Sequence, residues 1–559
     1  MKKKLLLSCF AVIGISALSQ AQSNESLDIN QVKSMVNAGG DLFWNFAGPK
    51  FEVPQGSGKH TIFTDNLWIG GLDPGNTLHL AAQTYRQNGT DFFQGPVSNP
   101  SEYNTNYDNQ WNKVWKLSKA MIDSFRLGLY GVNVPQVIQT WPGNGNPLIG
   151  QALQLAPYVD VNADGMYSYQ IGDYPCIKGD QAVFFMFNDD RAAHTESGAA
   201  KMGIEIHGML YAYDMPGTAL DTTIFLNYKI FNRSANDYNS VYVGNWADFD
   251  LGYYGDDYVG CDVGRNLFYC YNGDADDGSS PTPGAGTYGA NPPVQAIMML
   301  NGPLADPGDN VDNDRDGTTD ENGETCAMSR FVSYQNNALV TGNPTMTGHY
   351  YNYLLGKWKD NSPVTYGGNG YGGNMSAAFM YPGTSDPNGW GTSFVPQAAW
   401  DETIAGNIPS DRHGVGSYGP FILSAGEEIC IDYAFVWGRG NSGPGGSITV
   451  MQNNADDVRA FYDSTASCSC SSWPLGIPQQ ENLTVSLYPN PVNDILTIDY
   501  KAAGKNTRYA IYNPAGQIVS AGDIHDNHIT VNVSMLARSV YYIRIFDESS
   551  VAVGKFIRQ

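Results

Sequence analysis

The sequence predicts a mainly β, multi-domain protein in which β-sandwich-like domains carry long Gly- and Asn-rich loops and helices are few. The first observation behind this prediction is composition: the 559 residues include 63 Gly and 35 Tyr, and only 15% are charged. The second is that apolar segments have strand length and are separated by Gly, Asn and Asp, the residues that favour tight turns. The length is enough for two or three domains once the terminal segments are set aside.

The N-terminus has the features of a cleaved signal peptide, assigned to residues 1–21. Three lysines at positions 2–4 precede an apolar run over 5–18, and small residues at 19 and 21 suit a signal peptidase. The run is shorter than the ~20 residues that a transmembrane helix needs. Residues 6–9 resemble a lipobox, but almost no apolar sequence separates them from the lysines. We therefore expect a mature chain that begins at Gln22 and has no transmembrane anchor.

Four further segments are expected after the signal peptide. Residues 22–154 form an aromatic-rich N-terminal segment, and residues 155–466 form a central β-rich domain that contains the acidic motifs. Residues 467–484, rich in Ser and Pro, are expected to be a linker. Residues 485–559 are expected to form a small C-terminal β module.

Strands and helices of the central region can be placed from the pattern of apolar residues. The clearest strands are expected at Thr222–Phe231, Ser240–Trp246 and Glu428–Trp437, which alternate or run apolar over strand length. One helix is expected at Asp108–Phe125, where apolar residues fall near helical spacing, and another at Ile448–Tyr462, opened by Ser447.

The strongest chemical signal is the acidic stretch 312–321, DNDRDGTTDE. Ca²⁺ takes six to eight oxygen ligands, and side chains two residues apart in an open loop can all turn toward one point. Position twelve of the loop is Gly323 rather than the Glu of an EF-hand, so Glu321 or Glu324 is expected to close the shell. The loop resembles the DxDxDG calcium loops of thrombospondin type 3 and dockerin-like modules. The expected ligands are Asp312, Asp314, Asp316, the carbonyl of Thr318, Asp320 and Glu321.

A second loop, DVNADGMY, repeats this pattern with one acid fewer. For each loop the alternative is a turn without a metal: a solvated acidic turn at the first, and an Asx-rich β-turn at the second. Acids as close as those of the first loop repel one another strongly when no cation is bound. The expected ligands of the second loop are Asp160, Asn162, Asp164, the carbonyl of Met166 and Asp173.

A third acidic cluster lies in the segment WADFDLGYYGDDYVGCD. It contains Asp248, Asp250, Asp256, Asp257 and Asp262, and alternation places the first two on one face of a strand. Three alternatives stay open for this cluster. It could hold a third cation, it could consist of exposed loop acids, or two of its carboxylates could face each other as a glycosidase requires.

Charge and cysteine content restrict the partners and the chemistry. A formal net charge of −24 repels nucleic acid and anionic lipid and favours divalent cations instead. An exported chain can form disulfides, and Cys261 and Cys270 flank a predicted hairpin, so a local bridge between them is one open possibility. Cys468 and Cys470 lie two residues apart, and each is expected to pair elsewhere. No CxxC pair is present to support a zinc ribbon.

The C-terminal module carries the clearest resemblance to a known family. Its segments LYPNPVNDILTIDY (487–500), NPAGQIV (513–519), VYYIRI (540–545) and GKFI (554–557) occur in the family's order. The module resembles the type A C-terminal sorting domain of proteins exported by the type IX secretion system. This resemblance implies an Ig-like β-sandwich that is recognised by the type IX machinery and cleaved during export. The family usually has Gly just before the Tyr-Tyr-Ile-type strand, where this chain has Ser539 and Val540.

The central region contains, in order, GDYPCIKGDQAVFFMFND (172–189), HTESG (194–198), DDYVGCDVGRNLFYCYNGDADDG (256–278) and NPPV (291–294). With these segments, much of residues 155–373 resembles uncharacterised surface proteins that bear such sorting domains. No His-based, thiol-based or zinc motif in the chain has the partners that its chemistry requires. The sequence therefore favours a secreted or outer-membrane surface-attached protein that binds Ca²⁺ and acts in binding or adhesion, for instance to surface glycan or matrix. The alternative is a secreted hydrolase of polysaccharide or protein that uses carboxylates among Asp248, Asp250, Asp256 and Asp257.

Overall fold

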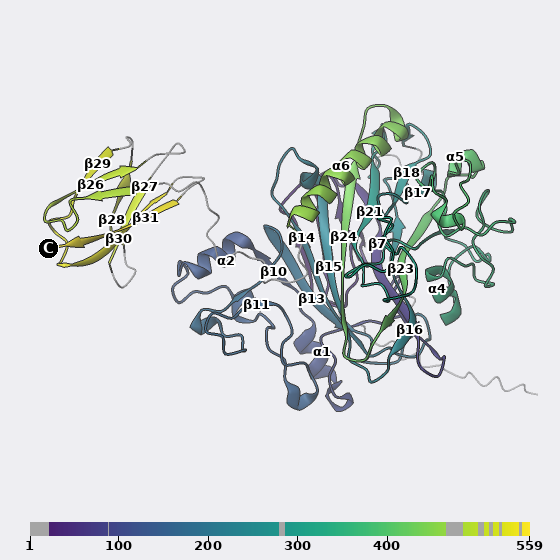
Figure 1. Ribbon diagram of the computed structural model, residues 1–559, viewed down its shortest axis with the longest axis horizontal. Coiled ribbons are helices and arrows are strands. Elements are labelled where there is room, and N and C mark those ends of the chain that lie inside the picture. Colours follow the sequence, from purple (N-terminus) through teal and green to yellow (C-terminus); the bar gives the residue numbers. More distant parts are fainter. Residues whose placement is uncertain are drawn as a thin grey trace, which may run out of the picture. The chain divides into compact units, whose positions relative to one another are not determined.

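The computed structural model describes residues 22–87, 89–278, 286–465, 485–500, 508–513, 518–524, 528–546 and 551–559. The chain divides into two compact units, Met1–Cys470 and Ser471–Gln559. Figure 1 shows both as β structures with few helices. The predicted fold class, mainly β with more than one domain, is confirmed. The predicted signal peptide and the predicted linker lie outside the described residues.

The larger unit is built on two antiparallel sheets. The first has nine strands in the order β10-β13-β14-β15-β24-β21-β18-β17, with β9 beside β13. The strands are β9 (Phe93–Gln94), β10 (Trp115–Ser118), β13 (Gln181–Asn188), β14 (Ile204–Ala212), β15 (Thr223–Asn232), β17 (Asp257–Asp262), β18 (Leu267–Asn272), β21 (Val294–Asn301) and β24 (Glu428–Gly438).

The second sheet has five strands in the order β22-β23-β16-β7-β8. They are β7 (Thr64–Leu72), β8 (Leu78–Ala82), β16 (Tyr238–Phe249), β22 (Arg330–Gln335) and β23 (Arg412–Leu423). The strands predicted at Thr222–Phe231, Ser240–Trp246 and Glu428–Trp437 are confirmed as β15, β16 and β24.

Smaller pairings complete the larger unit. A four-stranded sheet contains β1 (Asn24–Leu27), β2 (Lys33–Asn37), β5 (Phe51–Glu52) and β6 (His60–Ile62). Two-stranded pairs are β3 (Trp44–Asn45) with β4 (Gly48–Pro49), β11 (Tyr158–Val159) with β12 (Tyr174–Pro175), and β19 (Asp276–Asp277) with β20 (Gly289–Ala290). The helices are α1 (Thr105–Trp111), α2 (Lys119–Arg126), α3 (Gln136–Gln139), α4 (Thr347–Leu354), α5 (Glu402–Ala405) and α6 (Gly443–Thr465). Single 3₁₀ turns occupy Pro100–Glu102, Pro147–Ile149, Tyr169–Ile171, Ala219–Thr222, Tyr254–Asp256 and Trp390–Thr392.

Both faces of the nine-stranded sheet are buried, which explains its nearly continuous apolar strands. In β13, Val183, Phe185 and Phe187 belong to the core shared with the five-stranded sheet, whereas Phe184 and Met186 belong to a second core on the opposite face. Alternate side chains of a strand point to opposite faces, so a strand buried on both sides has no polar face.

Helix α6 covers part of the second core and lies along β24 and β21 (Figure 1). It buries Met451, Ala455, Val458 and Tyr462, which recur at helical spacing. The helix predicted at Ile448–Tyr462 is confirmed, but it begins earlier, at Gly443. Ser447 is not its first residue: it is buried, and its hydroxyl donates to the carbonyl of Pro292 over 2.7 Å.

The single helix predicted at Asp108–Phe125 is wrong. Helix α1 ends at Trp111, and Trp115–Ser118 forms the edge strand β10, paired with β13. Helix α2 begins only after Ser118, whose hydroxyl accepts the N–H of Met121 over 3.1 Å. Pairing with β13 therefore stabilises a strand at Trp115–Ser118 more than the helical spacing of the apolar residues favours a helix.

The boundary predicted at residue 154 does not separate two compact units. Strands β7, β8 and β10 precede this residue, yet β7 pairs with β16 and β10 pairs with β13, which follow it. The segment 22–154 thus completes sheets of the segment 155–466, and residues up to Cys470 form one unit.

The smaller unit is a β-sandwich with its own core. One sheet contains β25 (Val485–Tyr488), β26 (Ile495–Tyr500) and β29 (His528–Asn532). The other contains β27 (Arg508–Tyr512), β28 (Ile518–Asp523), β30 (Ser539–Phe546) and β31 (Val551–Arg558). Residues from both sheets, including Leu496, Ile511 and Phe556, are fully buried in one cluster.

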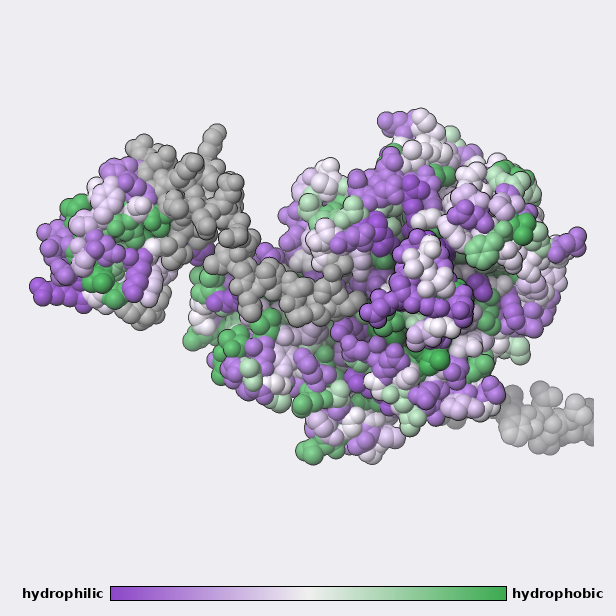
Figure 2. All heavy atoms as spheres, viewed as in Figure 1, coloured by the Kyte–Doolittle hydropathy of each residue, from purple (hydrophilic) through white to green (hydrophobic). Residues whose placement is uncertain are grey.

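The visible surface of the larger unit is mixed in hydropathy (Figure 2). Figure 2 shows hydrophilic and hydrophobic residues interspersed over the visible face of this unit. Among the described residues, no helix is both long enough and apolar enough to cross a membrane.

Candidate functional site

The acidic loop 312–324 lies between β21 and β22 and gathers carboxylates. Asp312, Asp314 and Asp316 each offer one carboxylate oxygen, and these oxygens lie within 4.8 Å of one another. Asp314, Glu321 and Glu324 form a second such group. Five of the acids near this loop are therefore brought together through Asp314, which belongs to both groups.

Local hydrogen bonds shape the loop. Asp312 Oδ2 accepts the N–H of Gly317 over 3.1 Å, and Asp314 Oδ1 accepts the N–H of Asp316 over 3.0 Å. Gly317 has a φ of 99°, a left-handed conformation that glycine adopts without strain. These turns direct successive acidic side chains toward the same region, as the spacing predicted.

Two carboxylate oxygens at the loop have no hydrogen-bond partner. Asp312 Oδ1 and Glu321 Oε2 are buried atoms without a donor in the part of the chain that the structure describes. Burial and the neighbouring carboxylates of Asp316, Glu324 and Asp312 raise the pKa of Asp314, although the N–H of Asp316 opposes the shift. The loop thus concentrates negative charge and leaves oxygen atoms available to a cation.

Arg315 fixes the loop to the body of the protein. Its guanidinium donates to the carbonyls of Met328 over 2.8 Å and Val263 over 3.0 Å, and it lies 5.6 Å from the ring centres of Phe379 and Trp390. Arg315 therefore anchors the loop and forms no ion pair with Asp312 or Asp314 in the part of the chain that the structure describes, although both carboxylates oppose the lowering of its pKa by burial.

Two of the expected calcium ligands, Asp320 and Thr318, also make hydrogen bonds within the loop region. Asp320 has a left-handed φ of 59° and accepts the N–H of Asn310 over 3.2 Å, and it belongs to neither carboxylate group. The N–H of Thr318 donates to Asp316 Oδ1 over 2.8 Å. Glu324, which the sequence offered as an alternative closing residue, is buried and joins Asp314 and Glu321.

The loop 160–173 is closed by hydrogen bonds within itself. Asp160 Oδ2 accepts the N–H of Gly165 over 2.7 Å, and the amide of Asn162 donates to Asp164 Oδ2 over 2.8 Å. Asp173 is fully buried, and its two oxygens accept the N–H groups of Val161 over 2.9 Å and Ser168 over 2.8 Å. Asp160, Asp164 and Asp173 are not among the groups of three carboxylates found in the described residues.

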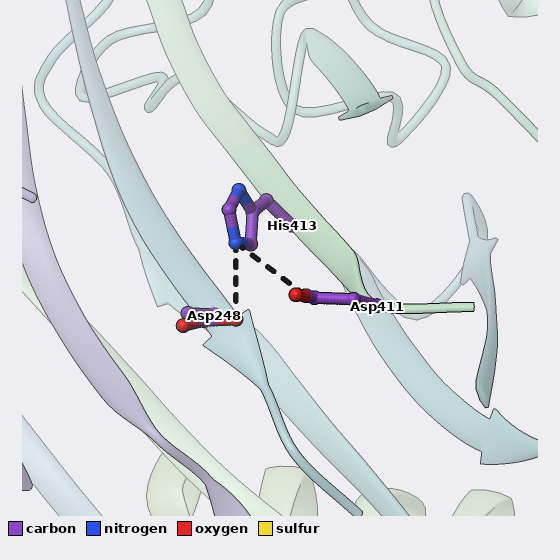
Figure 3. A group of neighbouring side chains, drawn as sticks. All are labelled: Asp248, Asp411 and His413. Atoms are coloured by element: carbon purple, nitrogen blue, oxygen red, sulfur yellow. Dashed lines mark ion pairs between the residues drawn. The ribbon is translucent and has the colours of Figure 1, made fainter. Parts of the chain in front are cut away.

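The third cluster contains a histidine that the sequence did not single out. Figure 3 shows Asp248 at the end of β16, His413 at the start of β23, and Asp411 just before it. Asp248 and His413 are directly opposite across the two strands. His413 Nε2 lies 3.1 Å from Asp248 Oδ1 and 3.7 Å from Asp411 Oδ1. The hydroxyl of Tyr85 donates to Asp248 Oδ2.

Other acids of this cluster have separate surroundings. Burial and the carboxylates of Asp248 and Asp411 raise the pKa of Asp250 well above its usual value. Asp257 is fully buried and accepts the N–H of Leu251 over 3.0 Å, whereas Asp262 pairs with Arg265 at 2.9 Å. Burial raises the pKa of Asp256 to about 6.

A cavity of about 340 Å³ opens beside His413. Its lining includes Tyr85, Glu196, Trp246, Tyr334 and Tyr350, contributed by β16, β22, α4 and two loops. Burial raises the pKa of Glu196 to about 7, although hydrogen bonds from Thr84 and Tyr350 oppose the shift. Glu196 Oε2 is buried without a hydrogen-bond partner among the described residues.

The cysteines do not form the bridge considered between Cys261 and Cys270. Both thiols are free and buried. In the β17–β18 pair, Cys261 is opposite Phe268 and Cys270 is opposite Val259, so the two are diagonal neighbours. Diagonal positions are roughly 7–8 Å apart, which is too far for a disulfide. Cys326 is also free, Cys176 and Cys430 are each disulfide-bonded, and Cys468 and Cys470 lie outside the described residues.

Sequence reasoning missed Glu196, Asp411 and His413. His413 lies 165 residues from Asp248 in the sequence, and no local spacing connects them. The alternation in RHGVGSYG (412–419) predicts a strand, but only the pairing of β16 with β23 shows which acid faces the imidazole.

Comparison with solved structures finds only distant likenesses. A DUF3244 family protein with an immunoglobulin-like β-sandwich fold from Bacteroides vulgatus is 19% identical, with 14% of this chain and 88% of that chain covered and a TM-score of 0.13. A polysaccharide lyase is 7% identical, with 63% and 34% covered and a TM-score of 0.18. PorZ, a surface component of the type IX secretion system of Porphyromonas gingivalis, is 10% identical, with 96% and 75% covered and a TM-score of 0.13. These scores are too low to bear on function.

No curated protein matches the chain. Residues 486–559 match the family described as the secretion system C-terminal sorting domain. This range coincides with the β-sandwich that begins at β25 and ends at β31. The chain therefore carries a secretion-system sorting domain at its C-terminal end, and this domain supports its assignment as a cargo protein of the type IX secretion system.

Proposed function

We propose that the protein is exported through its sorting domain and acts outside the cell, either released or attached to the outer-membrane surface, as a calcium-stabilised binding protein. The main support is the convergence of Asp312, Asp314 and Asp316, whose carboxylate oxygens lie within 4.8 Å of one another. Ca²⁺ prefers such clusters of oxygen ligands from a flexible loop. The buried Asp312 Oδ1, which has no donor among the described residues, is the ligand atom that most needs a cation.

Five side chains form the proposed calcium site. Asp312, Asp314 and Asp316 supply the first group, and Glu321 and Glu324 close it through Asp314. Backbone carbonyls such as that of Thr318, together with water, complete the six to eight oxygens that Ca²⁺ requires. The loop 160–173 remains a second, weaker proposal, because Asp160 and Asp173 already accept backbone N–H groups.

The calcium site is tested by isothermal titration of the mature chain, from Gln22 onward, with calcium after chelator treatment and dialysis. Saturable binding that Asp312→Asn weakens supports the site. Equal heats for the wild type and this variant would remove the site from the proposal.

Calcium has a structural role in this proposal. The loop is joined to the sheet core through Arg315, so a bound ion would hold the segment between β21 and β22 in one conformation. The binding role rests on the cavity beside His413, where the half-buried Tyr85 ring lies with polar Asn343 and Thr345, a combination that suits a sugar. The Trp246 and Tyr350 rings form its buried wall. A glycan array probed with the mature chain tests this role, and Tyr350→Ala serves as the variant expected to lose any signal.

Glu196 gives one specific reason to keep the hydrolase as a second candidate. The Glu196 carboxyl lines the cavity and has a pKa of about 7, and its Oε2 has no hydrogen-bond partner among the described residues. Such a carboxyl can give or take a proton near neutral pH. Turnover of a polysaccharide or protein by the mature chain, abolished in Glu196→Gln while the melting temperature is kept, would favour the hydrolase over the binding protein.

Export is tested separately from ligand binding. Deletion of residues 486–559 removes the matched domain and leaves the larger unit, which has its own cores. The truncated protein should remain in the periplasm, as measured by cell fractionation. Normal appearance of the truncated protein outside the cell would contradict the assigned route.

A further inference from the structure

The Asp248, Asp411 and His413 side chains form a compact donor set away from the calcium loops. One ligand atom from each, Asp248 Oδ1, Asp411 Oδ1 and His413 Nε2, lies within 4.8 Å of the others. Figure 3 shows the imidazole pointing its Nε2 edge toward both carboxylates. The set combines two oxygens and one imidazole nitrogen, a mixture that transition metals accept more readily than Ca²⁺ does.

The distances suit a shared ion. Two ligands about 2.1 Å from one metal lie about 3.0 Å apart at a right angle and about 3.4 Å apart at a tetrahedral angle. The 3.1 Å separation of His413 Nε2 from Asp248 Oδ1 falls between these values, and the 3.7 Å separation from Asp411 Oδ1 is longer than the tetrahedral value.

In the described part of the chain, the carboxylate oxygens that face the imidazole have no hydrogen-bond donor besides the imidazole itself. Asp248 Oδ1 and Asp411 Oδ1 are buried, and His413 Nε2 lies 3.1 Å and 3.7 Å from them. Asp248 and His413 are 5% and 1% exposed, and His413 lines the cavity beside them. A buried carboxylate oxygen without a partner is costly, and a metal ion would satisfy both oxygens at once.

The charge around the set is unbalanced. Asp248 and Asp411 face one imidazole, which can supply one positive charge at most. Asp250 adds a third carboxyl, whose pKa is raised by burial and by the Asp248 and Asp411 carboxylates. The nearest arginine in the sequence, Arg412, is committed elsewhere, because its guanidinium donates to both oxygens of Glu402 over 2.9 Å. The Asn336 amide donates to Asp411 Oδ2 over 3.0 Å and the Tyr85 hydroxyl donates to Asp248 Oδ2, and both are neutral.

We propose that Asp248, Asp411 and His413 bind a divalent transition-metal ion of the zinc class at the edge of the cavity that Glu196 and Tyr85 line. The Tyr85 hydroxyl and the Asn336 amide orient the two carboxylates from behind, as outer-shell groups do at metal sites. Three protein ligands leave at least one coordination position for water or a ligand. This site does not depend on calcium binding at the loop 312–324.

The main competing explanation is a buried ion pair. Burial alone would lower the pKa of His413, but the Asp248 and Asp411 carboxylates raise it, so an imidazolium could bridge the two acids without a metal. The two explanations differ in their response to added metal: only the metal site binds zinc or cobalt, and it does so with all three residues.

The test is equilibrium binding of Zn²⁺ to the mature chain in excess calcium, together with the visible absorption spectrum of added Co²⁺. One ion per chain is expected. His413→Gln and Asp248→Asn should weaken binding roughly tenfold or more and abolish the cobalt bands. His79→Gln is the matched control, because His79 also lies beside a carboxylate, Asp73 at 3.3 Å, but outside any group of three.

Folding of each variant is checked by its melting temperature. Asp411→Asn is the variant least prone to misfold, because Asp411 is only half-buried and its amide replacement can still accept from Asn336. Zinc binding that His413→Gln or Asp411→Asn reduces, and that His79→Gln leaves intact, supports the site. Absence of saturable zinc binding, or equal binding in wild type and folded His413→Gln, leaves a buried ion pair and overturns the proposal.

Discussion

Replacement of Asp314 by Asn should change stability in opposite directions with and without calcium. Asp314 belongs to both carboxylate groups of the loop, so its charge repels four neighbours at distances up to 4.8 Å. Two unit charges 4.8 Å apart in water repel by about 0.9 kcal/mol, so after screening by salt we expect the substitution to relieve about 1.5 kcal/mol. Asn can still accept the N–H of Asp316, so the turn is kept.

The corresponding shifts in melting temperature are small but measurable. A unit of about 450 residues unfolds with an entropy of about 0.9 kcal/mol per kelvin, so relief of ~1.5 kcal/mol raises the melting temperature by about 2 °C in chelator. Calcium at a hundredfold excess over Kd stabilises the wild type by about 2.7 kcal/mol, or about 3 °C. The variant lacks one ligand and should gain less than about 1 °C from calcium.

Differential scanning calorimetry in chelator and in calcium measures both effects. Asp457→Asn is the matched control, since it makes the same chemical change at an exposed position of α6. A wild type that melts at the same temperature with and without calcium, and a variant that is not stabilised in chelator, would refute the electrostatic reasoning for this loop.

Three further predictions follow from single sites. Burial raises the pKa of Glu196 to about 7, so the folded state binds more protons than the unfolded state between about pH 4.5 and 7, and the free energy of unfolding should fall across that window. Urea titrations at several pH values should show this loss, up to about 3 kcal/mol, in the wild type but not in Glu196→Gln. Asp173→Ala removes the acceptor of two backbone N–H groups and should cost about 3–5 kcal/mol, whereas the exposed Asp164→Asn should cost almost nothing; denaturant unfolding compares them. Burial raises the pKa of the Cys261 and Cys270 thiols, so a thiol reagent should modify them only after unfolding, and rapid labelling of the native protein would be inconsistent with the buried hairpin.

The sequence was sufficient for the three strands that it placed in the central region, because their patterns arise from local burial. β15, β16 and β24 lie where their apolar runs placed them, and α6 lies where its spacing placed it. The segment around Trp115 shows the limit of this reasoning. Its apolar residues also fit a helix, and only the pairing of β10 with β13, more than 60 residues later, selects the strand.

Contacts within one short loop of a candidate site could likewise be predicted from the sequence, whereas contacts between distant strands could not. The convergence of Asp312, Asp314 and Asp316 was visible in the sequence, because a DxDxDG spacing bends one short loop toward one point. Asp320, which that spacing also offers as a ligand, has a left-handed backbone and accepts the N–H of Asn310, and it belongs to neither group of converging acids. The proximity of Asp248 to His413 could not be foreseen, since it depends on the register of two strands distant in the sequence.

The most direct test of the proposed function is the amount of calcium bound to the purified mature chain. Equilibrium dialysis against a calcium buffer, followed by elemental analysis, gives the number of ions per chain for the wild type and for Asp312→Asn. We predict a bound ion in the wild type that the variant lacks, because Asp312 Oδ1 is one of the two buried oxygens at the loop without a donor in the described residues. A wild type without bound calcium, or a folded Asp312→Asn that retains every ion, would contradict the calcium site on which the proposal rests.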